Sequence, residues 1–165
     1  MIYLDSSALF KLVIEESETA ALRDFLRDRP RQLRVASALV RTEVVRAVAR
    51  RNPGAVLSAA HAVAKVTTIP VTVELLDAAA ALEPPLLRTL DAIHLASALT
   101  FRRNLTAFVA YDDRLHDAAE KARLPASRPV LDRPGGGVGY RVQMTDASGN
   151  AIDQTVIRAA FTHAP

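Results

Sequence analysis

Short apolar runs alternate with longer amphipathic stretches along residues 1–131. The runs at 2–4, 33–37, 67–72 and 106–113 have the length and composition of strands, and a last regular segment lies at 127–131. The stretches between them space apolar residues three and four positions apart, which predicts helices at 8–14, 17–29, 38–51, 54–66, 73–83, 86–101 and 114–124. This alternation predicts an α/β fold with a central, mostly parallel sheet and helices on both faces.

Local signals define several element boundaries. Ser6 or Ser7 is expected to cap the first helix, and Ser37 to cap the helix at 38–51. Pro70 predicts an edge position for the strand at 67–72, because proline cannot donate a hydrogen bond to a neighbouring strand.

Four acidic residues stand out by their position relative to these elements. They are Asp5 after the first strand, Glu43 within an apolar helix face, Asp91 in the first turn of a helix, and Asp112 after the last clear strand. Each alone has an ordinary structural explanation: a helix cap, an ion pair with Arg41 or Arg46, a charge that complements the helix dipole, or a turn residue.

Together the four acids predict a metal site. The carboxyl ends of parallel strands meet at one edge of the sheet, where ligands bind in such folds, so Asp5 and Asp112 are expected to converge there with Asp91. Carboxylates that lie close together repel each other unless one is protonated or a cation is present. Oxygen donors without sulfur or nitrogen select magnesium or manganese, ions that bind substrate phosphates.

Composition narrows the possible classes of protein. The chain has 165 residues, enough for one domain, and it contains no cysteine, which excludes disulfides, thiolate zinc sites and a cysteine nucleophile. It has neither a basic leader nor an apolar run long enough to span a membrane, so a cytoplasmic protein is expected. The net charge of +3 and the arginine-rich basic clusters are compatible with a polyanionic partner.

The composition changes after residue 131. Five of the six glycines lie in residues 132–165, and the GGGVG run at 135–139 is typical of a flexible joint. The alternation that follows predicts a hairpin that turns near residues 148–150. We therefore divide the chain into an α/β domain at 1–131 and a glycine-containing C-terminal extension at 132–165, of doubtful origin and expected to be flexible.

Several motifs resemble those of the PIN-domain ribonucleases, and specifically the VapC-like toxins of bacterial toxin–antitoxin pairs. They occur in the family's order as LDSSAL at 4–9, Glu43 within RTEV, RTLDAIHLASAL at 88–99 and YDDRL at 111–115. The third motif is the most specific, and the resemblance covers residues 1–131. It implies a PIN-like fold and metal-dependent cleavage of RNA by activated water, which leaves a 5′-phosphate.

The resemblance also implies roles for individual residues and partners. Asp5, Glu43, Asp91 and Asp112 take the places of the catalytic acids, with Asp5, Asp91 and Asp112 as ligands of Mg²⁺ or Mn²⁺. Asp113 competes with Asp112 for the fourth place. Ser6 matches a residue that binds metal-bound water or phosphate, although it can equally cap the helix. A VapB-like antitoxin, contacting the helices at 8–29 and 38–51, and a homodimer are the implied protein partners.

Other polar residues have weaker claims. His94 is expected to be an inward-facing structural histidine, and His116 to face solvent. Arg88 can reach a phosphate near the site, whereas Lys11 is expected to be ordinary surface charge. A serine hydrolase is disfavoured because no G-x-S-x-G motif is present, and receivers and aspartyl-phosphate phosphatases because their second acid is missing. A catalytically silent PIN-like module that binds RNA or protein remains the alternative to an endoribonuclease.

Overall fold

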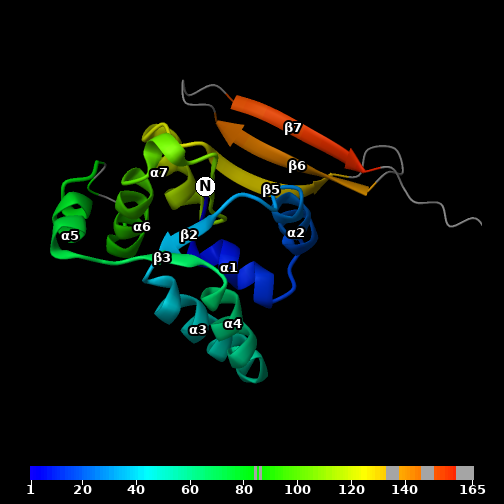
Figure 1. Cartoon of the computed structure of the whole chain (residues 1–165), viewed down its shortest axis with the longest axis horizontal. Coiled ribbons are helices and arrows are strands. Elements are labelled where there is room, and N and C mark those ends of the chain that lie inside the picture. Colours follow the sequence, from blue (N-terminus) through cyan, green and yellow to red (C-terminus); the bar gives the residue numbers. More distant parts are fainter. Residues whose placement is uncertain (84, 86, 133–137, 146–150, 159–165) are drawn as a thin grey trace, which may run out of the picture.

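The computed structural model describes residues 1–83, 85, 87–132, 138–145 and 151–158, which build one seven-stranded sheet with helices on both faces (Figure 1). The strands are β1 (Ile2–Leu4), β2 (Arg34–Ser37), β3 (Thr67–Ile69), β4 (Ala107–Val109), β5 (Ala126–Asp132), β6 (Val138–Thr145) and β7 (Ala151–Arg158), in the order β3-β2-β1-β4-β5-β6-β7. Strands β1 to β5 pair in parallel, and β6 and β7 add antiparallel to β5. The predicted α/β class is confirmed.

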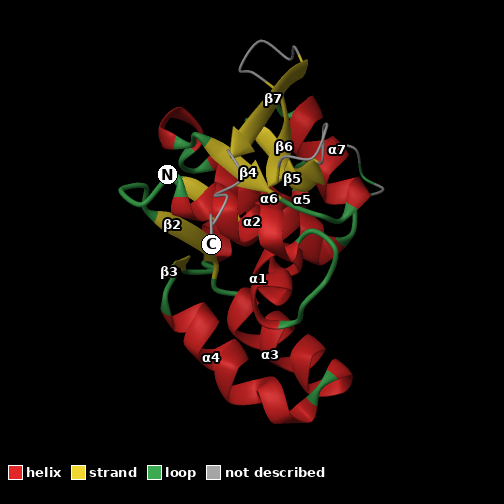
Figure 2. Ribbon diagram, turned by 90° about the vertical axis from the view of Figure 1, so that its right-hand side faces the viewer, coloured by secondary structure: helices red, strands yellow, loops and turns green. Residues whose placement is uncertain are grey.

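In the described part of the chain, seven α-helices connect and cover these strands (Figure 2). They are α1 (Ser6–Val13), α2 (Thr19–Arg27), α3 (Val40–Arg51), α4 (Val56–Ala64), α5 (Val73–Ala80), α6 (Thr89–Leu99) and α7 (Asp113–Lys121), with short 3₁₀ turns η1 (Pro53–Ala55) and η2 (Arg102–Asn104). Each of the seven α-helices falls within or overlaps a helix predicted from apolar spacing. No helix in the described ranges has both the length and the apolar character needed to cross a bilayer.

Successive residues of β1 serve opposite faces of the sheet, as the alternation of side chains along a strand requires. Ile2 and Leu4 belong to the core under α1 to α4, and Tyr3 belongs to the core under α6 and α7. All three are at most 1% exposed because helices cover both faces, which explains why this strand reads as a continuous apolar run. The Tyr3 ring stacks on Phe108 of β4, with the centroids 5.0 Å apart.

The C-terminal strands extend the sheet beyond the segment at which regular structure was expected to end. Strands β6 and β7 form an antiparallel pair beside β5, drawn in orange and red in Figure 1, so the predicted hairpin is confirmed. The turn predicted at 148–150 and the glycines at 135–137 lie outside the described residues. The edge position predicted from Pro70 is also confirmed, because β3 ends at Ile69 and borders the sheet.

The predicted helix caps need correction. The N-cap of α1 is Asp5, whose carboxylate accepts a hydrogen bond from the Ala8 amide at 2.8 Å, and neither Ser6 nor Ser7 has this role. Helix α3 begins after Leu39 without a side-chain cap, although the Leu39 amide donates to Ser37 Oγ at 3.4 Å. A carboxylate at the strand end reaches the amide three residues ahead, which leaves both serine hydroxyls free for other partners.

Candidate active site

The carboxyl ends of β1 and β4 lie side by side and bring the flanking loops together. The two strands pair in parallel, with Leu4 opposite Val109, and the Asp5 amide donates to the Val109 carbonyl at 3.1 Å. The Tyr111 amide donates to Ser7 Oγ at 2.8 Å, which links the loop after β4 to the start of α1. The expected placement of Asp5 and Asp112 at one edge of the sheet follows from this pairing.

Asp5 is held rigidly at the base of this edge. Its side chain accepts hydrogen bonds from Ser7 Oγ at 2.7 and 2.9 Å as well as from the Ala8 amide. The residue is only 3% exposed, and this burial raises the pKa of its carboxyl group above the usual range. Ser7 therefore fixes the Asp5 carboxylate and, through its contact with Tyr111, the loop that carries Asp112.

Glu43 lies in the first turn of α3, half-buried and facing α1 and α6. One of its oxygens, Oε2, accepts a hydrogen bond from Ser6 Oγ at 2.5 Å and one from His94 Nε2 at 2.8 Å. Burial alone would raise the pKa of Glu43, but the hydrogen bonds from His94 and Ser6 outweigh it and lower the pKa. Glu43 is thus held as a carboxylate, with its Oε1 outside these two bonds.

A chain of buried hydrogen bonds connects Glu43 to the central sheet. Because a carboxylate only accepts, His94 Nε2 carries the proton of their bond, and His94 Nδ1 accepts from the Tyr3 hydroxyl at 2.8 Å. The Tyr3 oxygen in turn accepts from the Ser37 amide at 3.1 Å. His94, 2% exposed, is the inward-facing residue that the sequence predicts, and it orients the Glu43 carboxylate.

Asp91 has a buried oxygen that no group among the described residues satisfies. It lies in the first turn of α6, and its Oδ2 atom is shielded from solvent without a hydrogen-bond partner. Burial raises the pKa of Asp91, and the negative charge of Asp112 raises it further, while the cation of Arg88 partly opposes the rise. Burial of such an oxygen is costly unless a hydrogen-bond donor or a cation binds it.

The structure separates Asp112 from its neighbour Asp113. Asp112 lines the main cavity at this edge of the sheet and caps α7, since its Oδ1 accepts from the Arg114 and Leu115 amides. The Asp113 side chain is 84% exposed and forms an ion pair with Arg128 at 2.7 Å. The two carboxylates therefore face different surroundings.

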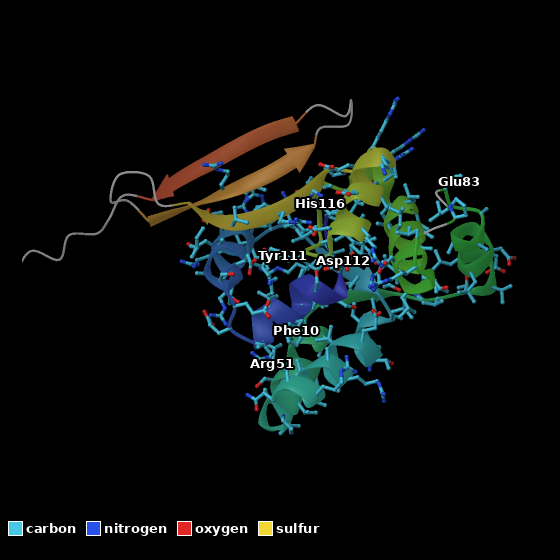
Figure 3. The ribbon with its side chains drawn as sticks, turned by 180° about the vertical axis from the view of Figure 1, so that it is seen from behind. Phe10, Arg51, Glu83, Tyr111, Asp112 and His116 are labelled. Carbon is cyan, nitrogen blue, oxygen red and sulfur yellow. The ribbon has the colours of Figure 1, made fainter. Side chains whose placement is uncertain are left out.

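An open cavity of about 700 Å³ lies over this edge, between α1, α3, α6 and the loop after β4. Its lining includes Ser6, Ser7, Glu43 and Asp112, whereas Asp5 and Asp91 are not among the lining residues. Figure 3 shows Phe10 on α1, with Tyr111 and Asp112 above the same helix. The cavity is large enough for a nucleotide-sized ligand.

The donor set fits a hard divalent cation. Asp5, Glu43, Asp91 and Asp112 offer only oxygen atoms, and the unsatisfied Asp91 oxygen is a ready ligand. The four are not packed into a tight cage: within the described ranges, the only three acid or histidine ligand atoms within 4.8 Å of one another come from His116, Asp117 and Glu120 on α7. An open arrangement suits Mg²⁺ or Mn²⁺, which keep waters and bind substrate oxygens.

Two expectations for basic residues are changed by the tertiary structure. His116 is only 7% exposed, so the prediction that it faces solvent is wrong; it lies on the buried side of α7 with Leu115 and Ala119. Burial lowers its pKa, and the Arg128 charge adds to this effect. Lys11 is not ordinary exposed surface charge: its side chain is 12% exposed, and its ammonium contacts Glu16 and Glu18 and lies over the Tyr111 ring.

Comparison with known proteins decides the family. The family model described as PIN domain matches residues 2–121, which is most of the chain. The chain belongs to the PIN domain family. Its curated relatives include Ribonuclease VapC46 of Mycobacterium tuberculosis strain ATCC 25618 / H37Rv, 44% identical over 128 residues that cover 78% of this chain and 97% of that protein. Ribonucleases VapC47 and VapC35 of strain CDC 1551 / Oshkosh are 41% and 40% identical, with the same coverage.

This PIN domain contains site residues that the sequence alone did not reveal. The sequence pattern does not distinguish Ser7 from an ordinary helix-capping serine or Tyr3 from an ordinary core residue. It predicts that His94 is a structural histidine but does not predict its hydrogen bond to Glu43. The signal available was the spacing of His94 three residues after Asp91, which places both on neighbouring turns of α6. That Tyr3 would reach across to His94 depends on the packing of α6 against β1.

Proposed function

We propose that this PIN domain is a divalent-metal-dependent endoribonuclease that acts as the toxin of a toxin–antitoxin pair. The observation that carries the proposal is a buried Asp91 oxygen without a partner among the described residues, near the sheet edge where Asp5 follows β1 and Asp112 follows β4. The names of its relatives, ribonucleases of 40% to 44% identity, supply the substrate class.

In this proposal Asp5, Asp91 and Asp112 hold Mg²⁺ or Mn²⁺. When bound, the ion would neutralise the charge of the phosphate and activate a water for in-line attack. We propose that water attacks the phosphorus and that the bond to the ribose 3′-oxygen breaks, so that the 2′-hydroxyl takes no part and the products carry a 5′-phosphate and a 3′-hydroxyl.

The chain's own side chains fix the reacting groups in place. Ser7 and the Ala8 amide immobilise Asp5, and Ser6 and His94 immobilise Glu43, whose lowered pKa keeps it ready to accept a proton from the attacking water. Arg88, exposed at the N-terminus of α6, adds a cation beside Asp91 that can contact the phosphate.

The assignment of the fourth acid rests on the different surroundings of two adjacent carboxylates. We assign the role to Asp112, which lines the cavity, and treat Asp113, paired with Arg128 at the surface, as outside the site. Asp113→Asn is thus a matched control for Asp112→Asn, and both substitutions preserve side-chain size.

The proposal is tested by mapping 5′-phosphate ends in total RNA after brief induction. Wild type and Asp113→Asn should produce new ends, whereas Asp5→Asn, Asp91→Asn and Asp112→Asn should produce none while remaining folded. Purified protein should cut the same sites with Mg²⁺ or Mn²⁺ and stop when EDTA is added. Absence of cleavage with either ion would refute the enzyme and leave an RNA- or protein-binding module.

The toxin role predicts a protein partner. An antitoxin of the VapB type is the proposed partner of the helices at 8–29 and 38–51. The first of these segments also lines a groove of about 660 Å³ between α1, α2 and α4, through Leu9, Leu12 and Leu26. Co-expression with a small neighbouring open reading frame should relieve toxicity and give a co-purified complex. Failure of both would count against the toxin role without affecting the nuclease. The homodimer implied by the family resemblance is checked by light scattering of the purified chain.

A further inference from the structure

The main cavity is lined by both acidic and basic side chains. Glu16, Glu43 and Asp112 line it together with Arg46 and Arg50, which follow Glu43 along α3. Both arginines are exposed, and neither forms an ion pair with any residue in the described part of the chain. The remaining lining cation, Lys11, is already engaged by Glu16 and Glu18. Arg46 and Arg50 are thus the lining cations available to a ligand.

Helix geometry sets how far these guanidinium groups lie from the acids. At about 1.5 Å rise per residue, Arg46 lies about 4.5 Å and Arg50 about 10.5 Å beyond Glu43 along the helix axis. The two arginines lie one turn apart on the same face of α3, so their forks can contact successive phosphates of one strand.

The uncharged part of the cavity lining suits the sugars and bases of a single strand. Phe10, Ala47 and Tyr111 line it, and none of them carries a charge. Figure 3 shows Phe10 and Tyr111 on the side of the cavity formed by α1 and the loop after β4. Apolar and aromatic walls beside a cationic track are the combination that binds single-stranded nucleic acids.

Resting on the proposed function, we infer that Arg46 and Arg50 bind two backbone phosphates of single-stranded RNA next to the one that is cleaved. The acids carry net negative charge and repel RNA, so the strand needs cations nearby to keep its scissile phosphate at the metal. Contacts to phosphate fix position without reading sequence, and the two arginines therefore raise affinity for any single strand rather than select a site.

Binding is measured in an Asp5→Asn background, where cleavage does not interfere, with a fluorescent single-stranded RNA 12-mer of mixed sequence. Arg46→Gln and Arg50→Gln should each raise the dissociation constant about threefold to fivefold. Each should also lower the slope of log affinity against log salt by about 0.7, the amount expected for one lost phosphate contact on a single strand. Arg41→Gln is the matched control, an exposed arginine of α3 outside the cavity lining, and should change neither quantity.

In the cleavage-competent protein, Arg46→Gln and Arg50→Gln should raise KM by the same factors and change kcat much less, because the arginines act on strand binding. The inference is overturned if both variants match Arg41→Gln in affinity and salt slope, or if the Asp5→Asn parent binds no single-stranded RNA. If affinity depends on the arginines but wild type never cleaves, the strand site stands and the proposed enzyme fails. If wild type cleaves and the arginine variants bind like the control, the enzyme stands and the strand site fails.

Discussion

Replacement of His94 by leucine should destabilise the protein and slow cleavage, because His94 connects two polar groups that have few other partners. Its bond to the Glu43 carboxylate involves a charged acceptor, for which a net value of about 1.5 kcal/mol is reasonable at a partly exposed site. The Tyr3 hydroxyl is fully buried, and leaving its proton without an acceptor costs about 1–3 kcal/mol. The added apolar burial of leucine recovers roughly 1 kcal/mol, so we expect a net loss of about 1.5–3.5 kcal/mol.

A double-mutant cycle isolates the Tyr3–His94 bond. Tyr3→Phe keeps the ring that stacks on Phe108 but removes the hydroxyl. In that background, His94→Leu therefore leaves no buried hydroxyl without an acceptor. The two losses should therefore be less than additive by about 1–2 kcal/mol. Urea unfolding followed by circular dichroism gives each free energy by linear extrapolation.

A rescue variant separates positioning of Glu43 from simple loss of stability. Glutamine at position 94 offers an amide N–H to Glu43 and a carbonyl to Tyr3, so His94→Gln should recover part of the kcat that His94→Leu loses. All rates are measured at a temperature where every variant is folded. Additive stability losses within about 0.5 kcal/mol, or an unchanged kcat in His94→Leu, would refute the reasoning.

Three further predictions concern the acids and the core. Burial raises the pKa of Asp5, so its contribution to stability is present below the unfolded pKa of about 3.9 and is lost as pH rises through the raised folded value. The stability of Asp5→Asn relative to wild type, both measured in EDTA, should therefore increase from pH 4 to pH 7. A stability difference that does not change with pH contradicts this prediction. Mn²⁺ at 100 times its dissociation constant should stabilise wild type by about 2.7 kcal/mol in urea unfolding and stabilise Asp91→Asn much less; equal effects would place the ion elsewhere. Phe108→Ala removes a fully buried ring stacked on Tyr3 and should lower the free energy of unfolding by about 3–5 kcal/mol, whereas a loss below 1 kcal/mol would contradict the described core.

The order of strands and helices was predictable because it depends on local periodicity. Residues 2–4 and 107–109 read as strands because both faces of the sheet are covered, and the helices between them show the spacing of one buried face. The acids at the strand ends could be predicted as site residues because parallel strands bring their carboxyl ends to one edge of the sheet. The motif at 88–99 indicated the resemblance to PIN-domain ribonucleases.

The tertiary structure decided which neighbours these residues have. His94 meets Glu43 across 51 positions of sequence and Tyr3 across 91, and no local pattern encodes contacts over such separations. Adjacent Asp112 and Asp113 share one sequence context, yet one lines a cavity and the other pairs with Arg128, because only the position of α7 against β5 distinguishes them. The prediction that His116 faces solvent is wrong because the burial of a residue on a short helix depends on which elements pack against that helix. The sequence by itself determined the elements and the acids; packing determined which oxygens are held, which is left without a partner, and which arginines share the cavity.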